Sequence, residues 1–156
     1  MKTINKEVHG IDLLNRYQNI LNNGQRAEIR RAIAPDDLSI MPAFYRLLEG
    51  GINYPGTRRI VYVLPFVTHQ KDGQSLGAAF AKANIKESRL FQVVRSTEPN
   101  DLQQLRRLIN QCKPQVDFIK LSKKLSFWNE RSKQGIIEDY YSQLYNKGKE
   151  GKNDKK

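Results

Sequence analysis

The 156-residue chain has 27 Lys and Arg residues against 16 Asp and Glu residues, which gives it a net charge of +11. A chain of this length buries about 70% of its unfolded surface around one core, so we expect a single domain. Its one cysteine excludes an internal disulfide, and no apolar run resembles a signal peptide or reaches the roughly 20 residues of a membrane span. We therefore expect a soluble, cytoplasmic protein without a membrane partner. The positive charge makes nucleic acid the first partner to consider.

The first predicted helix runs from about Lys6 to Leu21. Its apolar residues recur at helical spacing, namely Val8, Ile11, Leu14, Tyr17 and Ile20. The following Asn22-Asn23-Gly24 predicts a break in the chain.

The stretch from Gln25 to Leu48 has the most informative pattern. Ile29, Ala32 and Ile33 fall on one face of a predicted helix, and Arg31 lies nearly opposite them. Pro35 should end this helix, because the residue before a proline is pushed out of the α region. A second helix should begin near Pro42 and end at Gly50-Gly51.

Two acids lie at the joint between these helices. Arg26 and Arg30 sit at the edge of the apolar stripe, and their nearest carboxylate partners in the sequence are Asp36 and Asp37. Adjacent acids at such a joint are more often helix caps or arginine partners than metal ligands.

The segment 52–67, INYPGTRRIVYVLPFV, is compatible with either a strand or a helix. No second strand candidate is available to pair with it, so we favour a buried helix that begins after Thr57 and ends or kinks at Pro65. Arg58 and Arg59 would then lie in its first turn, where a bound phosphate would offset an unfavourable helix dipole. The alternative is that the helix begins elsewhere.

The second half of the chain predicts further short helices. One is capped by Ser75, one ends at Arg95, and one is capped by Asn100 with Gln103 three residues later. Asp117 should cap a helix that buries Phe118, Leu121, Leu125 and Trp128, and a last helix carries an apolar and tyrosine stripe from Ile136 to Tyr145. The lysine-rich segment 147–156 has the composition of a disordered tail.

Arginines that face away from apolar stripes are the main candidate ligands. Arg95 and Arg107 lie opposite the buried residues of their helices, as Arg31 does, and LRRLI (105–109) repeats the phase of IRRAI (29–33). Any one of these arginines is more often an ordinary surface residue. The set, together with a basic excess that persists outside the tail, favours nucleic-acid binding.

An enzyme would need a constellation of chemical groups that the sequence does not offer. His9 and His69 are far apart, no His or Cys has metal-ligand spacing, and Cys112 falls on an apolar face as a small core residue. We predict no catalytic residue, no metal and no cofactor.

Four segments carry a resemblance to a known family: IRRAIAPDDLSIMPAFYRL, SLGAAFAKANIKESRLFQVVR, QLRRLI and the region from FWNER to IIEDYY. In this order they resemble the small helical CasB subunit of the type I-E CRISPR effector complex, Cascade. The resemblance implies a non-enzymatic protein, present as two copies beside the backbone and large subunits of an RNA-protein complex. It also implies a part in holding unwound target DNA and the displaced strand, while guide pairing reads the sequence.

The resemblance also implies which residues contact nucleic acid. The family's basic positions match Arg31, Arg95, Arg107 and Arg131, and less closely Arg58. With the neighbouring arginines, the candidate set is Arg30, Arg31, Arg58, Arg59, Arg95, Arg106, Arg107 and Arg131. Glu98 and Glu130 depart from the basic pattern.

We therefore expect an all-α, single compact domain of about seven to nine short helices over residues 1–146, followed by a disordered basic tail over residues 147–156. The expected function is non-catalytic, sequence-independent binding of the nucleic-acid backbone within Cascade. A protein-interaction scaffold whose charge serves docking to acidic proteins is the alternative, and a metal-dependent nuclease is the third interpretation.

Overall fold

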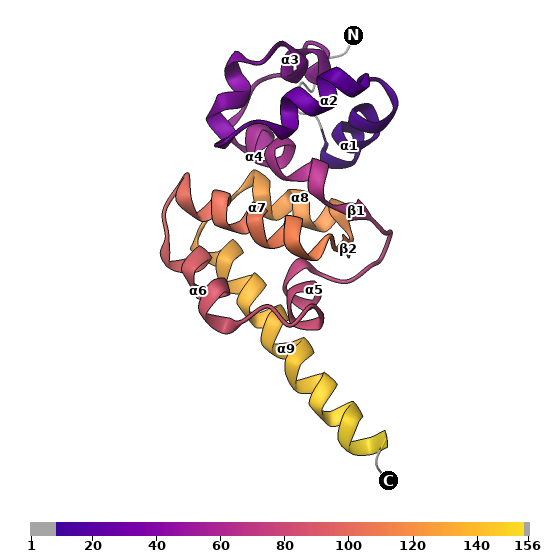
Figure 1. The fold of residues 1–156 in the computed structure, drawn as a ribbon, viewed down its shortest axis with the longest axis vertical. Helices are drawn as coiled ribbons and strands as arrows, with labels where there is room; N and C mark the ends of the chain where they lie inside the picture. The colour runs from indigo at the N-terminus through magenta and orange to yellow at the C-terminus, as the bar shows by residue number, and fades with distance from the viewer. Residues whose placement is uncertain (1–8, 155–156) are drawn as a thin grey trace.

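The computed structural model describes residues 9–154, with side chains described for residues 9–146. In this range the backbone forms nine α-helices, two 3-10 helices and one pair of two-residue strands (Figure 1). The α-helices are α1 (Gly10–Asn19), α2 (Asn23–Arg30), α3 (Pro42–Leu48), α4 (Pro55–Val63), α5 (Leu76–Lys82), α6 (Glu87–Arg95), α7 (Asn100–Cys112), α8 (Phe118–Ser126) and α9 (Glu130–Asp154). The 3-10 helices are η1 (Pro35–Ile40) and η2 (Leu64–Phe66), and the strands are β1 (Thr68–His69) and β2 (Gln115–Val116). The prediction of an all-α protein is confirmed.

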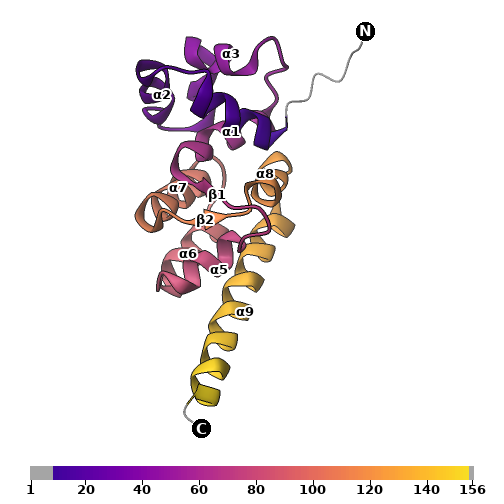
Figure 2. The same ribbon diagram turned by 90° about the vertical axis from the view of Figure 1, so that its right-hand side faces the viewer.

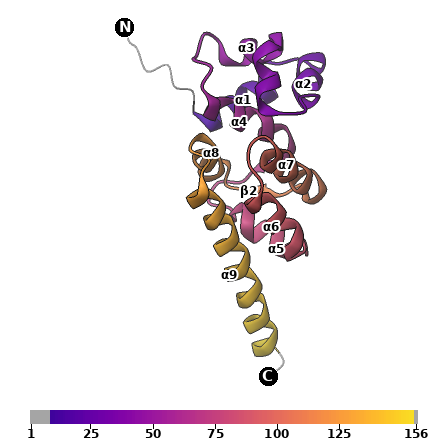
Figure 3. The same cartoon turned by 90° about the vertical axis from the view of Figure 1, so that its left-hand side faces the viewer.

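The helices are arranged along one long axis (Figures 1, 2 and 3). The group α1 to α4 forms one end, α7 and α8 lie across the middle, and α5 and α6 pack beside α9 at the other end. The end of α9 projects beyond the body in all three views. One cluster of buried side chains runs through the body, with members such as Leu13, Phe44, Tyr62, Phe80 and Phe118. This continuous core confirms the single compact domain.

The predicted first helix is confirmed over Gly10–Asn19, and its expected start before residue 9 lies outside the described residues. The break predicted at Asn22-Asn23-Gly24 lies slightly earlier, over residues 20–22, because Asn23 and Gly24 already belong to α2. Asn22 caps α2, because its side chain accepts a hydrogen bond from the Gln25 N–H (2.8 Å) while the Gln25 side chain accepts one from the Asn22 N–H (2.9 Å). The reciprocal pair is a capping box, so the new helix α2 begins directly after Asn22.

The predicted length of α2 is wrong. The helix ends at Arg30, and Ile33, expected on the buried face, is 70% exposed. Asp37 Oδ2 accepts hydrogen bonds from the N–H groups of Ile33 (2.9 Å) and Ala34 (3.0 Å), and the Tyr62 hydroxyl donates to the Ile33 carbonyl (2.7 Å). These bonds replace the helical ones before Pro35 is reached, so the backbone of Ile33 faces inward and its side chain faces outward.

The acids of the joint act as a cap and as an arginine partner, as predicted, but the predicted partners are wrong. Asp37 caps the backbone, and Asp36 pairs with Arg58. Arg26 instead donates to the backbone carbonyls of Tyr17, Gln18 and Leu21, and Arg30 donates to the Tyr17 hydroxyl (2.9 Å). Both arginines therefore tie α2 to α1.

The helical interpretation of the segment 52–67 is confirmed. The helix α4 begins at Pro55 and not after Thr57 as expected, since proline suits the first helical turn, and Pro65 converts its end into η2. The segment itself forms no strand, as expected, and the short parallel pair of β1 and β2, two residues each, begins only after it at Thr68. Such a short pair has too few residues for any pattern of alternation.

Caps in the second half are mostly as predicted. Ser75 accepts from the Ala78 N–H, and Asp117 accepts from the Ile119 and Lys120 N–H groups. Asn100 is the first residue of α7 and not its cap, since the helix begins one residue earlier than expected. Trp128 lies outside α8, which ends at Ser126.

The last helix differs from the expectation at its end. The described backbone of α9 stays helical to Asp154, through most of the segment 147–156 that its composition marks as a disordered tail. Extending an existing helix fixes only one residue per hydrogen bond, so a polar sequence can continue a helix that it could not nucleate. Within the described residues, no helix has the length and apolar character needed to cross a membrane.

Candidate nucleic-acid interface

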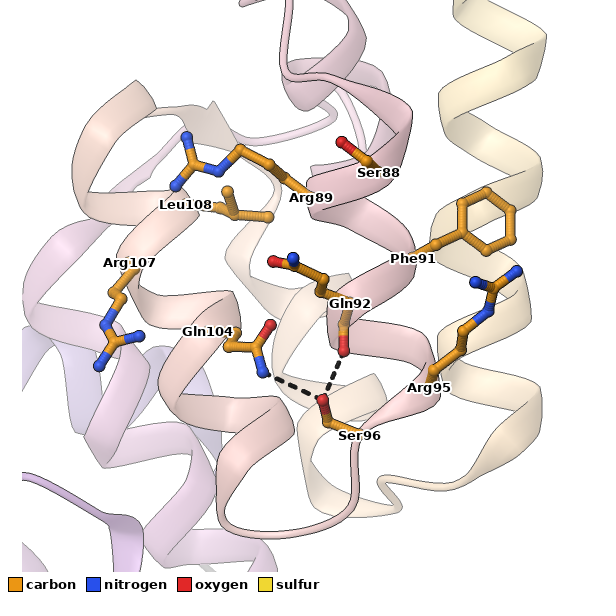
Figure 4. Close-up of a pocket in the computed structure, with 9 residues that line it drawn as sticks. All are labelled: Ser88, Arg89, Phe91, Gln92, Arg95, Ser96, Gln104, Arg107 and Leu108. Atoms are coloured by element: carbon orange, nitrogen blue, oxygen red, sulfur yellow. Dashed lines mark hydrogen bonds between the residues drawn. The ribbon is translucent and has the colours of Figure 1, made fainter.

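A surface groove between α6 and α7 has a volume of about 730 Å³ and gathers three arginines (Figure 4). Arg89 and Arg95 come from α6 and Arg107 comes from α7. The other lining residues are Ser88, Phe91, Gln92, Ser96, Gln104 and Leu108, so no carboxylate lies among the nine. The packing of α6 on α7 thus brings two of the predicted arginines, Arg95 and Arg107, into one groove.

The arginines differ in what holds them. Arg95 and Arg107 are exposed, and the Arg95 guanidinium lies 5.3 Å from the centre of the Phe91 ring. Arg89 reaches from α6 toward α7, where its Nη1 donates to Gln111 Oε1. The sequence interpretation missed Arg89. Gln92 and Ser96 follow Arg89 by three and seven residues, so all three lie on one helical face. This polar face was a pattern in the sequence from which Arg89 could have been predicted.

The wall of the groove is fixed by hydrogen bonds at the end of α6. Ser96 Oγ donates to the Gln92 carbonyl (2.5 Å) and accepts from Gln104 Nε2 (3.0 Å), as Figure 4 shows. These bonds join the last turn of α6 to the second turn of α7. The spacing between Arg95 and Arg107 is therefore held by the backbones of two packed helices.

The joint that carries Arg31 packs against the same helix as Arg107. Gln103 Nε2, one turn before Arg107 on α7, donates to the Ile33 carbonyl (3.1 Å). Arg31 is the exposed C-terminal cap of α2, two residues before this contact. The three arginines selected from helical phase are thus all exposed, and lie on α6, on α7 and on a joint that contacts α7.

Arg106 has a different environment from its neighbour Arg107. Its guanidinium lies 4.0 Å from the centre of the Tyr62 ring and 5.1 Å from that of Phe66. Burial lowers the pKa of Arg106, and it raises the pKa of the Tyr62 hydroxyl. Arg106 therefore packs internally, between α7 and the α4–η2 segment.

Arg58 and Arg59 are held by internal contacts. Arg58 Nε donates to Asp36 Oδ1 (3.0 Å), and its Nη1 donates to Asn53 Oδ1 (2.7 Å). Arg59 Nε donates to the Leu125 carbonyl (2.6 Å), and its Nη2 donates to the Ser126 carbonyl (2.9 Å).

Glu98, one of the two acids that interrupt the basic pattern, lies 3.2 Å from Arg59 Nη1. Arg59 thus connects α4 to the end of α8 through hydrogen bonds and to the turn before α7 through an ion pair. The acid at position 98 is explained by this internal pair.

Arg131 and Arg30 lie in other places. Arg131 is exposed in a separate groove of about 510 Å³ between α8 and α9. Arg30 lines a smaller hollow with Asn110 and Lys113. The eight predicted arginines therefore do not form a single cluster.

The other candidate groups have structural partners. His69 Nδ1 accepts a hydrogen bond from the Phe118 N–H (3.0 Å). Cys112 is half-buried against the core, as its apolar face predicted, and burial raises the pKa of its thiol. Among the residues that the structure describes, no three His, Cys, Asp or Glu side chains gather at one point where they could hold a metal ion.

Known proteins match this chain in sequence and in structure. The family described as CRISPR-associated protein Cse2 matches residues 25–141. The CRISPR system Cascade subunit CasB of Escherichia coli strain K12 is 34% identical over 150 residues, which cover 86% of this chain and 93% of that protein. A chain in the crystal structure of E. coli Cascade bound to a double-stranded DNA target is also similar, with a TM-score of 0.84 and 34% identity over 90% of this chain and 99% of that one. The chain therefore belongs to the family of CRISPR-associated Cse2 proteins.

Proposed function

We propose that this chain is a non-catalytic small subunit of a type I-E CRISPR RNA-guided complex, Cascade. There it binds the nucleic-acid backbone without sequence specificity and stabilises the R-loop, meaning the unwound target DNA with its displaced strand. Membership of the Cse2 family and the likeness to a chain of a DNA-bound Cascade support this place in the complex. The groove between α6 and α7, with three arginines and no lining carboxylate, is the observation that carries the binding role.

The chemistry of the groove suits phosphate. A guanidinium is a planar donor of several hydrogen bonds that pairs with phosphate oxygens in a bidentate manner. Contacts of this kind position a protein on nucleic acid but read no bases. In an RNA-guided complex the guide strand supplies sequence recognition, so a subunit that contacts only the backbone is sufficient for this task.

The proposed contact set is narrower than the arginines selected from the sequence. It comprises Arg31, Arg89, Arg95 and Arg107, with Arg30 and Arg131 as flanking contacts. We leave out Arg58 and Arg59, whose guanidinium groups each bond to several partners including an acid, and Arg106, which packs on two rings. Arg30 and Arg89 are kept, because each makes one side-chain hydrogen bond to an uncharged group.

The proposal includes the partners implied by family membership. The chain would associate with the backbone and large subunits of the complex, as two copies, in the cytoplasm. Target DNA and the displaced strand would be its ligands, and it would need no metal or cofactor for this role. Incubating pure protein with DNA or RNA and Mg²⁺ or Mn²⁺ tests the non-catalytic part, since reproducible cleavage abolished by Asp36→Ala would contradict it.

A salt titration tests the binding role. Each of Arg95→Ala and Arg107→Ala should weaken binding equally for unrelated DNA sequences and reduce the log-log salt slope by about 0.7 to 0.9. Arg46→Ala is the matched control, because Arg46 is exposed on α3, outside the groove. An unchanged slope in both groove variants would favour the second candidate function, a scaffold that docks on acidic proteins.

A further inference from the structure

Phe127 is the most exposed aromatic side chain among the described residues, with 73% of its surface accessible. It lies directly after α8 and lines the second groove together with Lys123, Lys124 and Arg131. Single exposed apolar residues are common on protein surfaces, so the exposure of Phe127 alone does not indicate a binding site. The surroundings of the ring decide what it can do.

The backbone of Phe127 is held in place. Ser132 Oγ lies 2.7 Å from the Phe127 carbonyl, to which it donates, and 3.3 Å from the Lys124 carbonyl. Asn129 Oδ1 accepts from the Ser132 N–H (3.0 Å), which fixes the start of α9. The ring is therefore presented from a fixed turn between two helices, and the entropy lost on binding a ligand there is small.

The charge around the ring is mainly positive. Lys123 and Arg131 are exposed and line the groove, and Lys124 Nζ lies 4.0 Å from Asp139. Glu138 is the one acid among the nine lining residues. An apolar protein partner would gain nothing from these cations, whereas a polyanion with flat, apolar groups matches both the charges and the ring.

We propose that this groove is a subsite for single-stranded nucleic acid, in which an unpaired base stacks on Phe127. The phosphates on either side of that base pair with Lys123 and Arg131. This inference rests on the proposed nucleic-acid function and deepens it, because it adds a contact to a base to the proposed contacts with phosphates. Bases within a duplex stack on each other and leave no face for the ring, so the subsite distinguishes single strands from duplex DNA.

The experiment uses the full chain and two DNA ligands of equal length, a single strand of mixed sequence and its duplex. Phe127→Ala should weaken single-strand binding roughly 5- to 150-fold, the range expected for loss of one stacked base, and leave duplex binding unchanged. Phe127→Trp should restore binding, since a larger ring also stacks. Tyr45→Ala is the control, because Tyr45 is an exposed ring on α3, outside this groove.

A second measurement reports stacking directly. A single strand with one 2-aminopurine should lose fluorescence on binding the natural chain and Phe127→Trp, and should keep it with Phe127→Ala. Full quenching with Phe127→Ala, or an equal loss of single-strand and duplex binding, would overturn the subsite. If Arg95→Ala and Arg107→Ala still reduced the salt slope in that case, the proposed function would stand without it. If the natural chain bound neither ligand at low salt, the proposed function and the subsite would both be wrong.

Discussion

Lys133 Nζ lies 2.8 Å from Asp101 Oδ2, and both side chains are almost fully buried, with 7% and 1% of their surfaces accessible. The same carboxylate oxygen accepts from Trp128 Nε1 (2.8 Å), and Lys133 also donates to the Ser96 carbonyl (2.8 Å). This pair joins α9 to the first turn of α7 and to the end of α6. Because Ser96 lines the arginine groove, the pair helps to hold together the helices that form it.

Removing one partner of this pair should be costly. Lys133→Ala leaves the Asp101 carboxylate buried without a cation, and breaking a buried pair in this way costs about 3 to 5 kcal/mol of the free energy of unfolding. Urea denaturation measures the loss. Lys124→Ala, which removes a half-exposed pair with Asp139, should cost about 0 to 1 kcal/mol. Equal losses in the two variants would show that the buried pair contributes no more to the free energy of unfolding than the half-exposed pair.

A close approach of helices depends on Gly77. A Cβ atom at this position of α5 would lie 2.2 Å from the Ile136 carbonyl oxygen of α9 and 2.8 Å from the Tyr140 nitrogen. Gly77→Ala must therefore separate the two helices, and we expect a loss of about 1 to 3 kcal/mol. Gly24→Ala is the control, since a Cβ there meets only Asn22 Oδ1 at 3.5 Å. The melting temperature should fall for Gly77→Ala and should stay the same or rise for Gly24→Ala.

Tyr141 should titrate above the ordinary range. Its hydroxyl donates to Glu87, and this hydrogen bond raises the pKa of Tyr141 to about 12. A tyrosine in an unfolded chain has a pKa of about 10, so the stabilisation is complete below pH 10 and is lost between about pH 10 and 12. The difference between tyrosinate absorbance curves of the natural chain and Tyr141→Phe isolates this group. When the same pair of curves is measured in the Glu87→Gln background, the midpoint of the Tyr141 titration should move toward lower pH. An unchanged midpoint would contradict the hydrogen bond to Glu87 as the cause of the raised pKa.

Arg59 and Arg107 should separate folding from binding. Arg59→Ala leaves the carbonyls of Leu125 and Ser126 without their donor and should lower the free energy of unfolding by about 1 to 3 kcal/mol. Arg107→Ala removes an exposed side chain and should change it by less than about 0.5 kcal/mol. Chemical denaturation of both variants checks this contrast. A large loss in Arg107→Ala would assign that arginine a structural role.

Helix phase predicted the fold and the exposure of the key arginines, since both depend on local spacing. Arg95 and Arg107 are exposed as their positions opposite apolar stripes predict. The helix α4 was predicted because no second strand was available to pair with its segment. The early end of α2 could not be predicted in this way. It depends on the Tyr62 hydroxyl, which reaches the Ile33 carbonyl from another helix.

The candidate site was predicted in part for the same reason. Phase cannot distinguish an arginine that is free from one that is bonded to a distant carbonyl. Arg59 bonds to residues more than 60 positions away, and Arg106 packs on the rings of Tyr62 and Phe66. Helix phase also could not predict that α6 packs on α7, which places Arg89 in one groove with Arg95 and Arg107.

The most direct test of the central claim measures R-loop stability in the assembled CRISPR RNA-protein complex. The variant replaces Arg31, Arg95 and Arg107 by Glu, which converts attraction for phosphate into repulsion at each position. All three side chains are exposed, so the melting temperature should be retained. Co-purification with the complex should also be retained if these residues contact DNA and not neighbouring subunits. We predict that the R-loop dissociates faster in this variant. A normal R-loop lifetime in a complex that contains the triple Glu variant would contradict the claim that these arginines hold the unwound DNA.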